Sequence, residues 1–420
     1  MSEPTKTSRL VGKHLTSPRD ERSWTTLVTA PFLPSALAAL LAYQGFVLAW
    51  FVTSVLMTEL TDDPVYIALV NAAVQVPLLL VAVPAGTLAS QFNRRSLLLA
   101  GHMSTVALLL IYAYATSRLP LTRWLLITML FGLGTTASFA MALWQIVGPD
   151  LVAHASVSTA TILISGSFNA ARAIGPLIGA TTIGLFGSTP TLLLSAFFVG
   201  GALILLSIPK STATGLTAAN PETPSPRISS NQHLSPTSLP PRTCQAALVS
   251  VCGSSVPALL PALVKGQYQN DVPTVLGLLT SFLGFGALCG IIASTIIHRH
   301  LGLGSILRLT AGMVFVLNAA IALPAPLWLL SVFTLAFGAS WFLFGTSLNI
   351  AVRTEAPIAL KSQLVARFLM TFYLGTAIGS VLWGALASHI GVHAALLAAS
   401  VGNMIAVFVE AGSRPKRTRA

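Results

Sequence analysis

Twelve apolar stretches, each long enough to cross a lipid bilayer as a helix, follow one another along this 420-residue chain. A spanning helix needs about 20 mainly apolar residues, and it must satisfy its own backbone hydrogen bonds because lipid offers no partner for them. The sequence therefore predicts an all-α membrane protein. The expected spans are 34–57, 66–89, 96–116, 124–147, 158–186, 190–208, 244–264, 274–297, 305–323, 327–351, 363–388 and 392–411.

Composition excludes a water-soluble domain. Only 8% of the residues are charged and 54% are hydrophobic, whereas soluble domains carry about 25% charged residues. The net charge of +12 is typical of membrane proteins whose cytoplasmic loops retain Lys and Arg, and we expect no nucleic-acid partner. The three cysteines lie in apolar stretches and predict small buried side chains, not a disulfide framework: Cys244, Cys252 and Cys289.

Charge placement predicts the orientation of the chain in the membrane. An even number of spans puts both termini on one side, and the loops on the opposite side hold only Arg118, Arg123 and Lys265 among the basic residues. Because basic residues are retained in the cytoplasm, both termini are expected there. The polar N-terminal tail has no basic segment leading into a short apolar core and a cleavage site, so we expect no removable signal peptide. These features predict a multi-pass protein of the inner (plasma) membrane.

The chain also carries signs of an internal duplication. A Pro-, Ser- and Thr-rich segment between two sets of six spans lacks the apolar content to fold or span, which is typical of a flexible cytoplasmic linker. Shifting the first set by 204 residues superimposes Gly86 on Gly290, Arg95 on Arg299 and Gly187 on Gly391. The predicted organisation is a cytoplasmic tail (1–29), a six-helix bundle (30–208), the linker (209–243), a second six-helix bundle (244–411) and a basic tail (412–420).

Several motifs resemble those of one transporter superfamily. The loop "GTLASQFNRRSLL" (86–98) resembles the loop signature of the major facilitator superfamily. The segments "ELTDDPVYIALVNAA", "WQIVGPDLV", "FNAARAIGPLIGA" and "IGSVLWGALASHIGVHAALLAA" are similar to its enterobactin-exporter and macrolide-efflux branch, of the transmembrane secretion effector type. The resemblance implies two parallel six-helix repeats, a substrate site near mid-membrane between them, and alternating access.

The loop after the second span departs from the family pattern. Ser90, Gln91 and Asn93 stand where the resemblance leads us to expect acidic and basic residues, and neutral hydrogen bonds are weaker than charge-assisted ones. We therefore predict a weakened cytoplasmic latch. By resemblance, the gating residues are Gly86, Ser90, Arg94 and Arg95. The two arginines either contact Asp150 or Glu355 on neighbouring loops or serve only as topological anchors.

Arg172 is the one basic residue deep within a predicted span. Counting from Ser158 places it about 21 Å into a core about 30 Å thick. A charge at this depth is costly and usually faces a cavity or a partner. Arg172 is therefore either an anchor for an anionic substrate, a modulator of a coupling proton, or a structural residue that pairs with Glu59 or Asp63 or caps carbonyls near Pro176.

Gly175, Pro176 and Gly179 resemble the antiporter motif of the fifth helix, and we predict a conformational role for them. Glycines four residues apart allow close helix approach, and proline lets a helix bend. The spacing recurs at Gly286/Gly290 and Gly375/Gly379. Such pairs indicate either contacts between the two halves or ordinary helix packing.

No acidic residue lies in the middle of a predicted span. Because proton-coupled carriers commonly use a membrane carboxylate, the candidates for proton coupling are Glu59 and Asp63 at span ends, followed by His102, whose imidazole titrates near neutrality. The alternative interpretation is that each of these three is an ordinary surface or interface residue without a role in proton coupling. Coupling can also be absent, which leaves facilitated diffusion.

The predicted substrate pathway is apolar with scattered aromatic and amide groups, a lining that suits a bulky amphipathic solute. The candidate substrate-binding residues are Arg172, Asn169, Gln44, Gln75, Tyr43, Trp50, Phe139, Trp341 and Tyr373, with Phe46, Asn71 and Phe344 at similar depths. The alternative interpretation of any one of these aromatic residues is that it packs against other side chains and does not contact the substrate.

Enzyme, metal and cofactor signatures are missing from the sequence. "GFGALCG" lies within a span without a preceding strand, and His389 and His393 lack a third metal ligand. We expect a monomeric secondary transporter, in contact with lipid and a small-molecule substrate, that exports a siderophore or drug-like amphiphile by proton antiport. The alternatives are uptake or facilitated diffusion of a metabolite, or a non-transporting partner or sensor protein.

Overall fold

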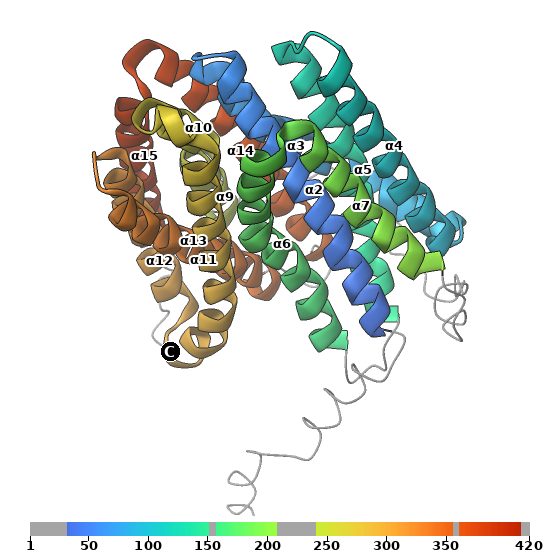
Figure 1. The fold of residues 1–420 in the computed structure, drawn as a ribbon. Coiled ribbons are helices and arrows are strands. Elements are labelled where there is room, and N and C mark those ends of the chain that lie inside the picture. The colour runs from blue at the N-terminus through green and yellow to red at the C-terminus, as the bar shows by residue number, and fades with distance from the viewer. Residues whose placement is uncertain (1–31, 151–156, 208–240, 356–360, 413–420) are drawn as a thin grey trace, which may run out of the picture.

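The computed structural model describes residues 32–150, 157–207, 241–355 and 361–412, and these residues form an all-α bundle (Figure 1). The first half consists of α2 (Phe32–Leu60), α3 (Pro64–Gln91), α4 (Arg94–Arg118), α5 (Arg123–Asp150), α6 (Val157–Phe186) and α7 (Ser188–Ser207). The second half consists of α9 (Pro241–Gly253), α10 (Ser255–Gln267), the short η2 (Gln269–Asp271), α11 (Val272–His300), α12 (Leu303–Ala322), α13 (Leu327–Glu355), α14 (Lys361–Ile390) and α15 (Val392–Gly412). Nearly all of the predicted linker and both predicted tails lie outside the described residues.

The helices match the predicted spans closely. Ten stretches of the described residues are long and apolar enough to cross a membrane, α9 and α10 counting together as one. α6 and the shorter apolar run Val392–Ile405 in α15 occupy the two remaining predicted positions. The all-α fold with two six-helix repeats is therefore confirmed.

Turns between the helices follow local chemistry. The Asp63 carboxylate accepts a hydrogen bond from the Val65 amide (2.9 Å) at the start of α3, and Asn93 caps α4 in the same way. Gly187 and Gly391 have positive φ angles of 86° and 88°, which glycine adopts without steric cost. Because these two glycines superimpose under the 204-residue shift, the same one-residue turn ends the fifth predicted span of each half.

The seventh predicted span differs from expectation, because it is two helices and not one. α9 ends at Gly253 and α10 begins at Ser255. Pro257 has no amide hydrogen to donate to the Gly253 carbonyl, so the continuous helical ladder is interrupted there. The Trp383 indole of α14 donates to the Val251 carbonyl (2.7 Å) next to the break. The bend places Pro257 against the space between the two halves.

The two halves meet along α6 with α11 and along α3 with α14. Small residues allow these helices to approach. A Cβ atom on Gly277 would collide with Ala180 and the Pro176 carbonyl, one on Gly284 with the Arg172 backbone, and one on Gly384 with Ala68. Close approach across the halves therefore depends on three glycines of the second half.

The glycine pairs identified in the sequence pack within their own halves. Gly175 and Gly179 lie against Val47 and Phe51 of α2, while Gly286 and Gly290 lie against α13. Gly375 and Gly379 lie against α9 and Ser254. Of the two interpretations of these pairs, the structure supports ordinary helix packing. Pro176, between the first pair, is the residue of this motif that faces the other half.

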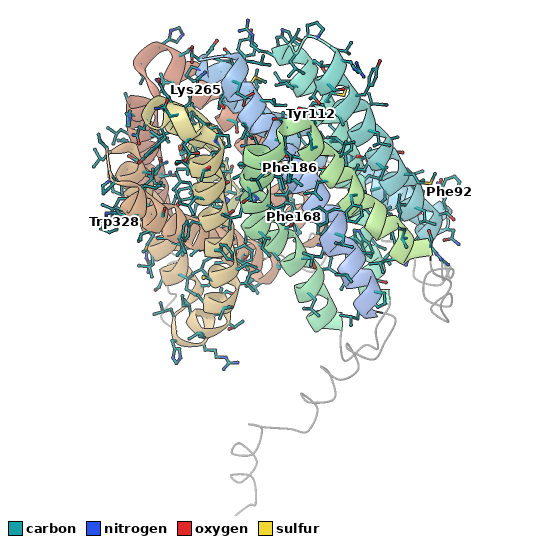
Figure 2. The ribbon with its side chains drawn as sticks, viewed as in Figure 1. Phe92, Tyr112, Phe168, Phe186, Lys265 and Trp328 are labelled. Atoms are coloured by element: carbon teal, nitrogen blue, oxygen red, sulfur yellow. The ribbon has the colours of Figure 1, made fainter. Side chains whose placement is uncertain are left out.

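The outer surface of the bundle is apolar, as a lipid-facing surface must be. Exposed side chains include Trp328 (68% exposed) and Phe197 (73% exposed). Trp328 and Phe92 lie at opposite edges of the bundle in Figure 2. Because apolar groups in this position would be unfavourable in water and are favourable in hydrocarbon, the surface fits a multi-pass membrane protein.

The two ends of the bundle differ. We call the end at which α2 begins and α15 ends the tail end, which lies at the bottom of Figure 1. The opposite end carries the turn Thr61–Asp63 and Lys265, and we call it the closed end because side chains of the two halves contact each other there.

Candidate functional site: a chamber between the halves

A chamber of about 490 Å³ lies between the two halves. Four helices of the first half (α2, α3, α5 and α6) and three of the second (α10, α13 and α14) contribute to its wall. The lining runs from Trp50, Arg172 and Pro257 deep in the bundle to Arg353 in the last turn of α13. Since that turn lies at the tail end, the chamber extends from mid-bundle toward the tail end.

The wall is mainly aromatic and aliphatic. Trp341 stacks on Phe337 with ring centroids 6.0 Å apart and contacts Phe372 at 5.5 Å. Phe46, Trp50 and Phe168 contribute from the first half. Such a wall provides a large apolar contact area with few, directional polar groups, as small-molecule sites do.

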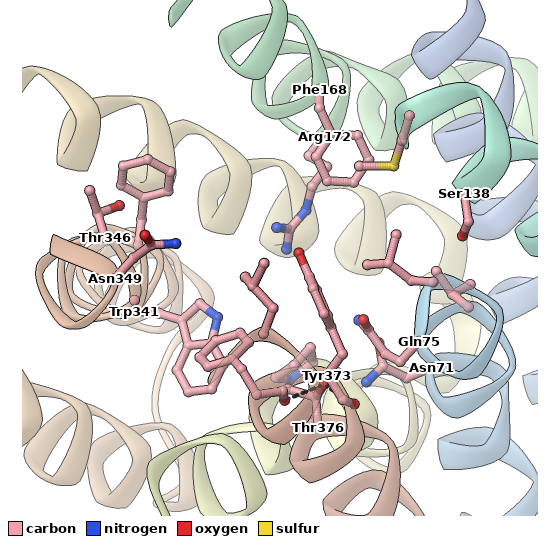
Figure 3. A pocket seen from close by; sticks show the side chains of 18 of the residues that line it. Asn71, Gln75, Ser138, Phe168, Arg172, Trp341, Thr346, Asn349, Tyr373 and Thr376 are labelled. Carbon is pink, nitrogen blue, oxygen red and sulfur yellow. Dashed lines mark hydrogen bonds between the residues drawn. The ribbon is translucent and has the colours of Figure 1, made fainter. Parts of the chain in front are cut away.

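Arg172 is the charged group in the deepest part of this chamber. Its guanidinium carbon lies 6.0 Å from the centre of the Phe168 ring, one helical turn away on α6. No hydrogen bond or ion pair joins its side chain to another residue within the described part of the chain. Figure 3 shows the guanidinium directed into the chamber, with the Tyr373 hydroxyl pointing toward it from α14. The described residues therefore offer Arg172 no carboxylate, and neither Glu59 nor Asp63 pairs with it.

A second, smaller chamber of about 70 Å³ continues toward the closed end. It shares Trp50, Arg172 and Pro257 with the large chamber and is otherwise lined by residues such as Ser54, Pro261 and Thr280. Three residues thus form the common wall of the two spaces. Arg172 therefore lines both chambers.

Polar groups near Arg172 come from both halves. Asn71 of α3 donates to the Ser380 hydroxyl of α14 (2.8 Å), and the Asn71 side-chain oxygen has no partner in the described structure. Gln75 lies one turn further along α3 and also lines the chamber. Figure 3 places Asn71, Gln75 and Tyr373 on the same side of the chamber.

Five of the nine substrate-binding candidates line the chamber: Trp50, Gln75, Arg172, Trp341 and Tyr373. The other four lie behind the wall. Tyr43 packs edge-on against Phe168 (5.4 Å between ring centroids), Asn169 donates to the Ser165 carbonyl of its own helix, and Gln44 and Phe139 lie within the first half. Phe46 and Asn71 line the chamber as well, whereas Phe344 is buried in the second half.

The sequence-based reasoning missed most of the α13 and α14 faces. The additional lining residues are Phe342, Gly345, Thr346, Asn349, Ile350 and Arg353 on α13, and Phe368, Leu369, Phe372 and Thr376 on α14. Residues three and four apart share a helix face, and this rule applied to Trp341 and Tyr373 would have found Gly345, Leu369 and Thr376 directly.

The three proton-coupling candidates do not line either chamber. Glu59 is exposed at the closed end of α2, and Asp63 caps α3. His102 is only 2% exposed, lies 6.2 Å from the Trp144 ring, and has no partner for its Nε2 atom in the described structure. Among the described residues, no cluster of three His, Cys, Asp or Glu side chains is placed to hold a metal ion.

The predicted gating loop makes local contacts at the tail end. Arg95 donates to the Leu206 carbonyl (2.8 and 3.1 Å) and to the Ser207 carbonyl (3.1 Å), at the end of α7. A cation at a helix C-terminus is favourable, so Arg95 stabilises its own half.

The other predicted gating residues also make local contacts. Ser90 donates to the Thr87 carbonyl within α3 (2.7 Å), and Arg94 approaches the Ala89 carbonyl (3.5 Å). Gly86 lies within α3. The side chains of Asp150 and Glu355 lie outside the described part.

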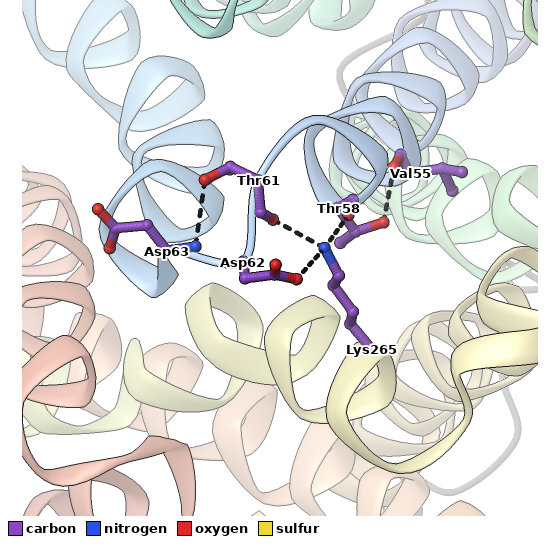
Figure 4. A network of polar contacts seen from close by, with 6 residues as sticks. All are labelled: Val55, Thr58, Thr61, Asp62, Asp63 and Lys265. Carbon is purple, nitrogen blue, oxygen red and sulfur yellow. Dashed lines mark hydrogen bonds and ion pairs between the residues drawn. The ribbon is translucent and has the colours of Figure 1, made fainter.

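The closed end holds a polar contact between the halves (Figure 4). The Lys265 ammonium of α10 donates to the Thr58 carbonyl (2.5 Å) and the Thr61 carbonyl (3.0 Å) at the end of α2, and it pairs with the Asp62 carboxylate at 2.5 Å. Lys265 is one of the few basic residues that we placed on the outer side from the sequence. We call this contact the Lys265 lock.

Sequence comparison decides the family. A profile described as transmembrane secretion effector matches residues 22–419, which is nearly the whole chain. The chain belongs to the transmembrane secretion effector family. This membership, together with the fold, identifies it as a membrane transporter of the major facilitator type. A comparison with curated proteins finds no match in sequence.

Solved structures agree with this family in fold. A POT family transporter in complex with a thioalcohol-conjugated peptide aligns with a TM-score of 0.70 and 11% identity, over 92% of this chain and 96% of that one. A D-xylose–proton symporter gives 0.68 at 14% identity, over 90% and 96%. A bacterial homologue of the human lysosomal transporter Spinster, inward-facing and occupied, gives 0.67 at 14% identity, over 94% and 97%. At these identities the likeness concerns the fold alone.

Proposed function

We propose that this secretion effector family member exports a bulky amphipathic small molecule, a siderophore or a drug-like compound, by alternating access. The observation that carries the proposal is the aromatic-lined chamber of about 490 Å³ between the two halves. It lies at the interface of two repeats, where carriers of this architecture bind their substrates.

The conformation fits one step of such a cycle. The chamber extends toward the tail end, while the Lys265 lock joins the halves at the other end. If both termini are cytoplasmic, as the charge distribution predicts, this is the state that loads substrate from the cytoplasm. The direction of export is supported by the family description and by the predicted topology.

Export can be tested by measuring the accumulation of a labelled catecholate siderophore and of a hydrophobic macrolide in pump-deficient cells. Gly345 lines the chamber, and an added Cβ there would meet only the Phe372 ring, at the ordinary contact distance of 3.8 Å, so Gly345→Phe should obstruct the chamber without forcing the helices apart. The control is Gly312→Phe in α12, where no other atom lies within 4 Å of an added Cβ.

We expect wild type and Gly312→Phe to lower the accumulation of at least one solute and Gly345→Phe to abolish this effect at equal expression. A protonophore should also abolish it if export is coupled to proton entry. Equal accumulation in wild type and vector controls would contradict export of these classes. Higher accumulation in wild type would instead favour uptake.

A further inference from the structure

We propose that the chamber binds an amphipathic organic monoanion whose negative group pairs with Arg172. The inference rests on the proposed transport function and specifies the substrate class. Its basis is the charge balance of the chamber wall, the donors around Arg172 and the position of this arginine between two chambers.

The wall carries positive charge without a compensating carboxylate. Two cations line the large chamber, Arg172 and Arg353, and no Asp or Glu is found among the lining residues that the structure describes. Arg353 is exposed near the tail end and donates to the Asn349 side-chain oxygen (2.6 Å). Arg172 is deep in the bundle, where it lies near the Phe168 ring and has no hydrogen-bond or ion-pair partner among the described residues. An unpaired charge inside a membrane protein costs free energy. An anionic ligand that pairs with Arg172 would remove this cost.

The groups around Arg172 complement an acid. Tyr373 directs its hydroxyl toward the guanidinium (Figure 3), and this hydroxyl has no hydrogen-bond partner in the described structure. The Trp341 indole N–H likewise has no partner there. A carboxylate bound between Arg172 and Tyr373 would accept hydrogen bonds from both. Charge-assisted hydrogen bonds of this kind are about twice as strong as neutral ones.

The remaining wall defines the rest of the ligand. Phe46, Trp50 and Phe168 on one side and Trp341 and Phe372 on the other favour an aromatic or other apolar ring system. Because only one deep cation is available, a second negative charge on the ligand would lie against apolar side chains. The chamber therefore favours a monoanion over a polyanion.

Arg172 also borders both chambers. Since the small chamber continues toward the closed end from the shared wall of Trp50, Arg172 and Pro257, an anion at Arg172 can be approached from the tail end now. It would be approached from the closed end after the halves rock. One binding position thus serves both access states.

Three probes with the same ring and different charge test the inference: naphthalene-2-carboxylate, naphthalene-2-carboxamide and (2-naphthylmethyl)trimethylammonium. Their binding to purified full-length protein in lipid nanodiscs would be measured by equilibrium dialysis of radiolabelled probe, with empty nanodiscs as the blank. The variants are Arg172→Gln, Arg172→Lys and, as a matched cation in the same chamber, Arg353→Gln.

We expect the carboxylate to bind at least about 10-fold more tightly than the amide and the ammonium probe to bind least, since a hydrogen bond to a charged group contributes about 1.5–3 kcal/mol. Arg172→Gln should remove the preference for the carboxylate while leaving amide binding within about 2-fold. Arg172→Lys should restore part of the preference, and Arg353→Gln should keep it. Unchanged amide binding also shows that Arg172→Gln remains folded.

Equal binding of carboxylate and amide to wild type, or no binding of either, would overturn the inference. So would a preference for the carboxylate that survives in Arg172→Gln. Failure of the proposed function is distinguishable from these outcomes. Charge-selective binding without any flux of the bound acid into proteoliposomes would contradict transport and leave the anion site standing.

Discussion

Asp63 illustrates how one side chain can serve structure or proton coupling, and the two roles make different demands on it. Its carboxylate accepts a hydrogen bond from the Val65 amide and caps α3. Asparagine makes the same cap but cannot titrate, whereas alanine does neither. Loss of an N-cap costs about 1 kcal/mol.

We therefore expect Asp63→Ala to lower the thermal unfolding temperature of the purified protein and Asp63→Asn to leave it unchanged. Asp271 precedes α11 without a capping bond, so Asp271→Ala is the control and should be neutral. If Asp63 carries the coupling proton, Asp63→Asn will abolish protonophore-sensitive export despite normal stability. Normal export by Asp63→Asn would leave only the capping role.

At the scale of helices, the crossing of α11 and α13 depends on glycine. A Cβ atom on Gly286 would lie 2.0 Å from the Leu335 carbonyl oxygen, which is backbone and cannot move aside. Gly286→Val should therefore separate the two helices and sharply reduce the yield of folded protein, measured as the monodisperse peak in size-exclusion chromatography.

The control for this prediction is Gly312→Val in α12, because an added Cβ meets no other atom within 4 Å there. The two substitutions share the same change in helix propensity, so a difference between them reports packing alone. Equal yields for both variants would contradict the close α11–α13 contact.

Helix positions could be predicted from the sequence because length and composition are enough to define a span. The break between α9 and α10 was missed, since the stretch is apolar enough overall to be read as one span although Gly253, Ser254 and Pro257 mark the interruption. The rotation of each helix about its own axis was harder to predict than the depth of its residues in the membrane. Counting residues gives depth, but a helix that is apolar on all sides does not show which face meets the chamber. Gln44 and Asn169 were therefore assigned to the wall although they lie behind it, and Asn349 and Thr376 were overlooked.

At the scale of the whole molecule, the Lys265 lock should set the balance between the two access states. Lys265 contacts α2 across the two halves, whereas Arg123 at the same end lies over the Tyr66 ring (4.4 Å) within one half. Lys265→Gln should raise the population that is open at the closed end, and Arg123→Gln should not. A population shift of about 5-fold corresponds to about 1 kcal/mol, the upper range for an exposed ion pair.

The measurement uses Ser54→Cys in a background without Cys244, Cys252 and Cys289, because Ser54 lines the small chamber and not the large one. Reaction of the introduced thiol with a membrane-impermeant reagent, added to sealed vesicles from the closed-end side, should be faster in Lys265→Gln. Equal rates in Lys265→Gln, Arg123→Gln and the parent protein would show that the lock does not restrain this opening.

The shared wall of Trp50, Arg172 and Pro257 has a consequence for inhibitor design. A compound that fills the large chamber can enter only from the tail-end face of the membrane, so it must first cross the bilayer if that face is cytoplasmic. Once bound, it would keep the halves in their present arrangement. A blocker delivered from outside the cell would instead need to be narrow enough for the space around Ser54, and its access would depend on how often the Lys265 lock opens.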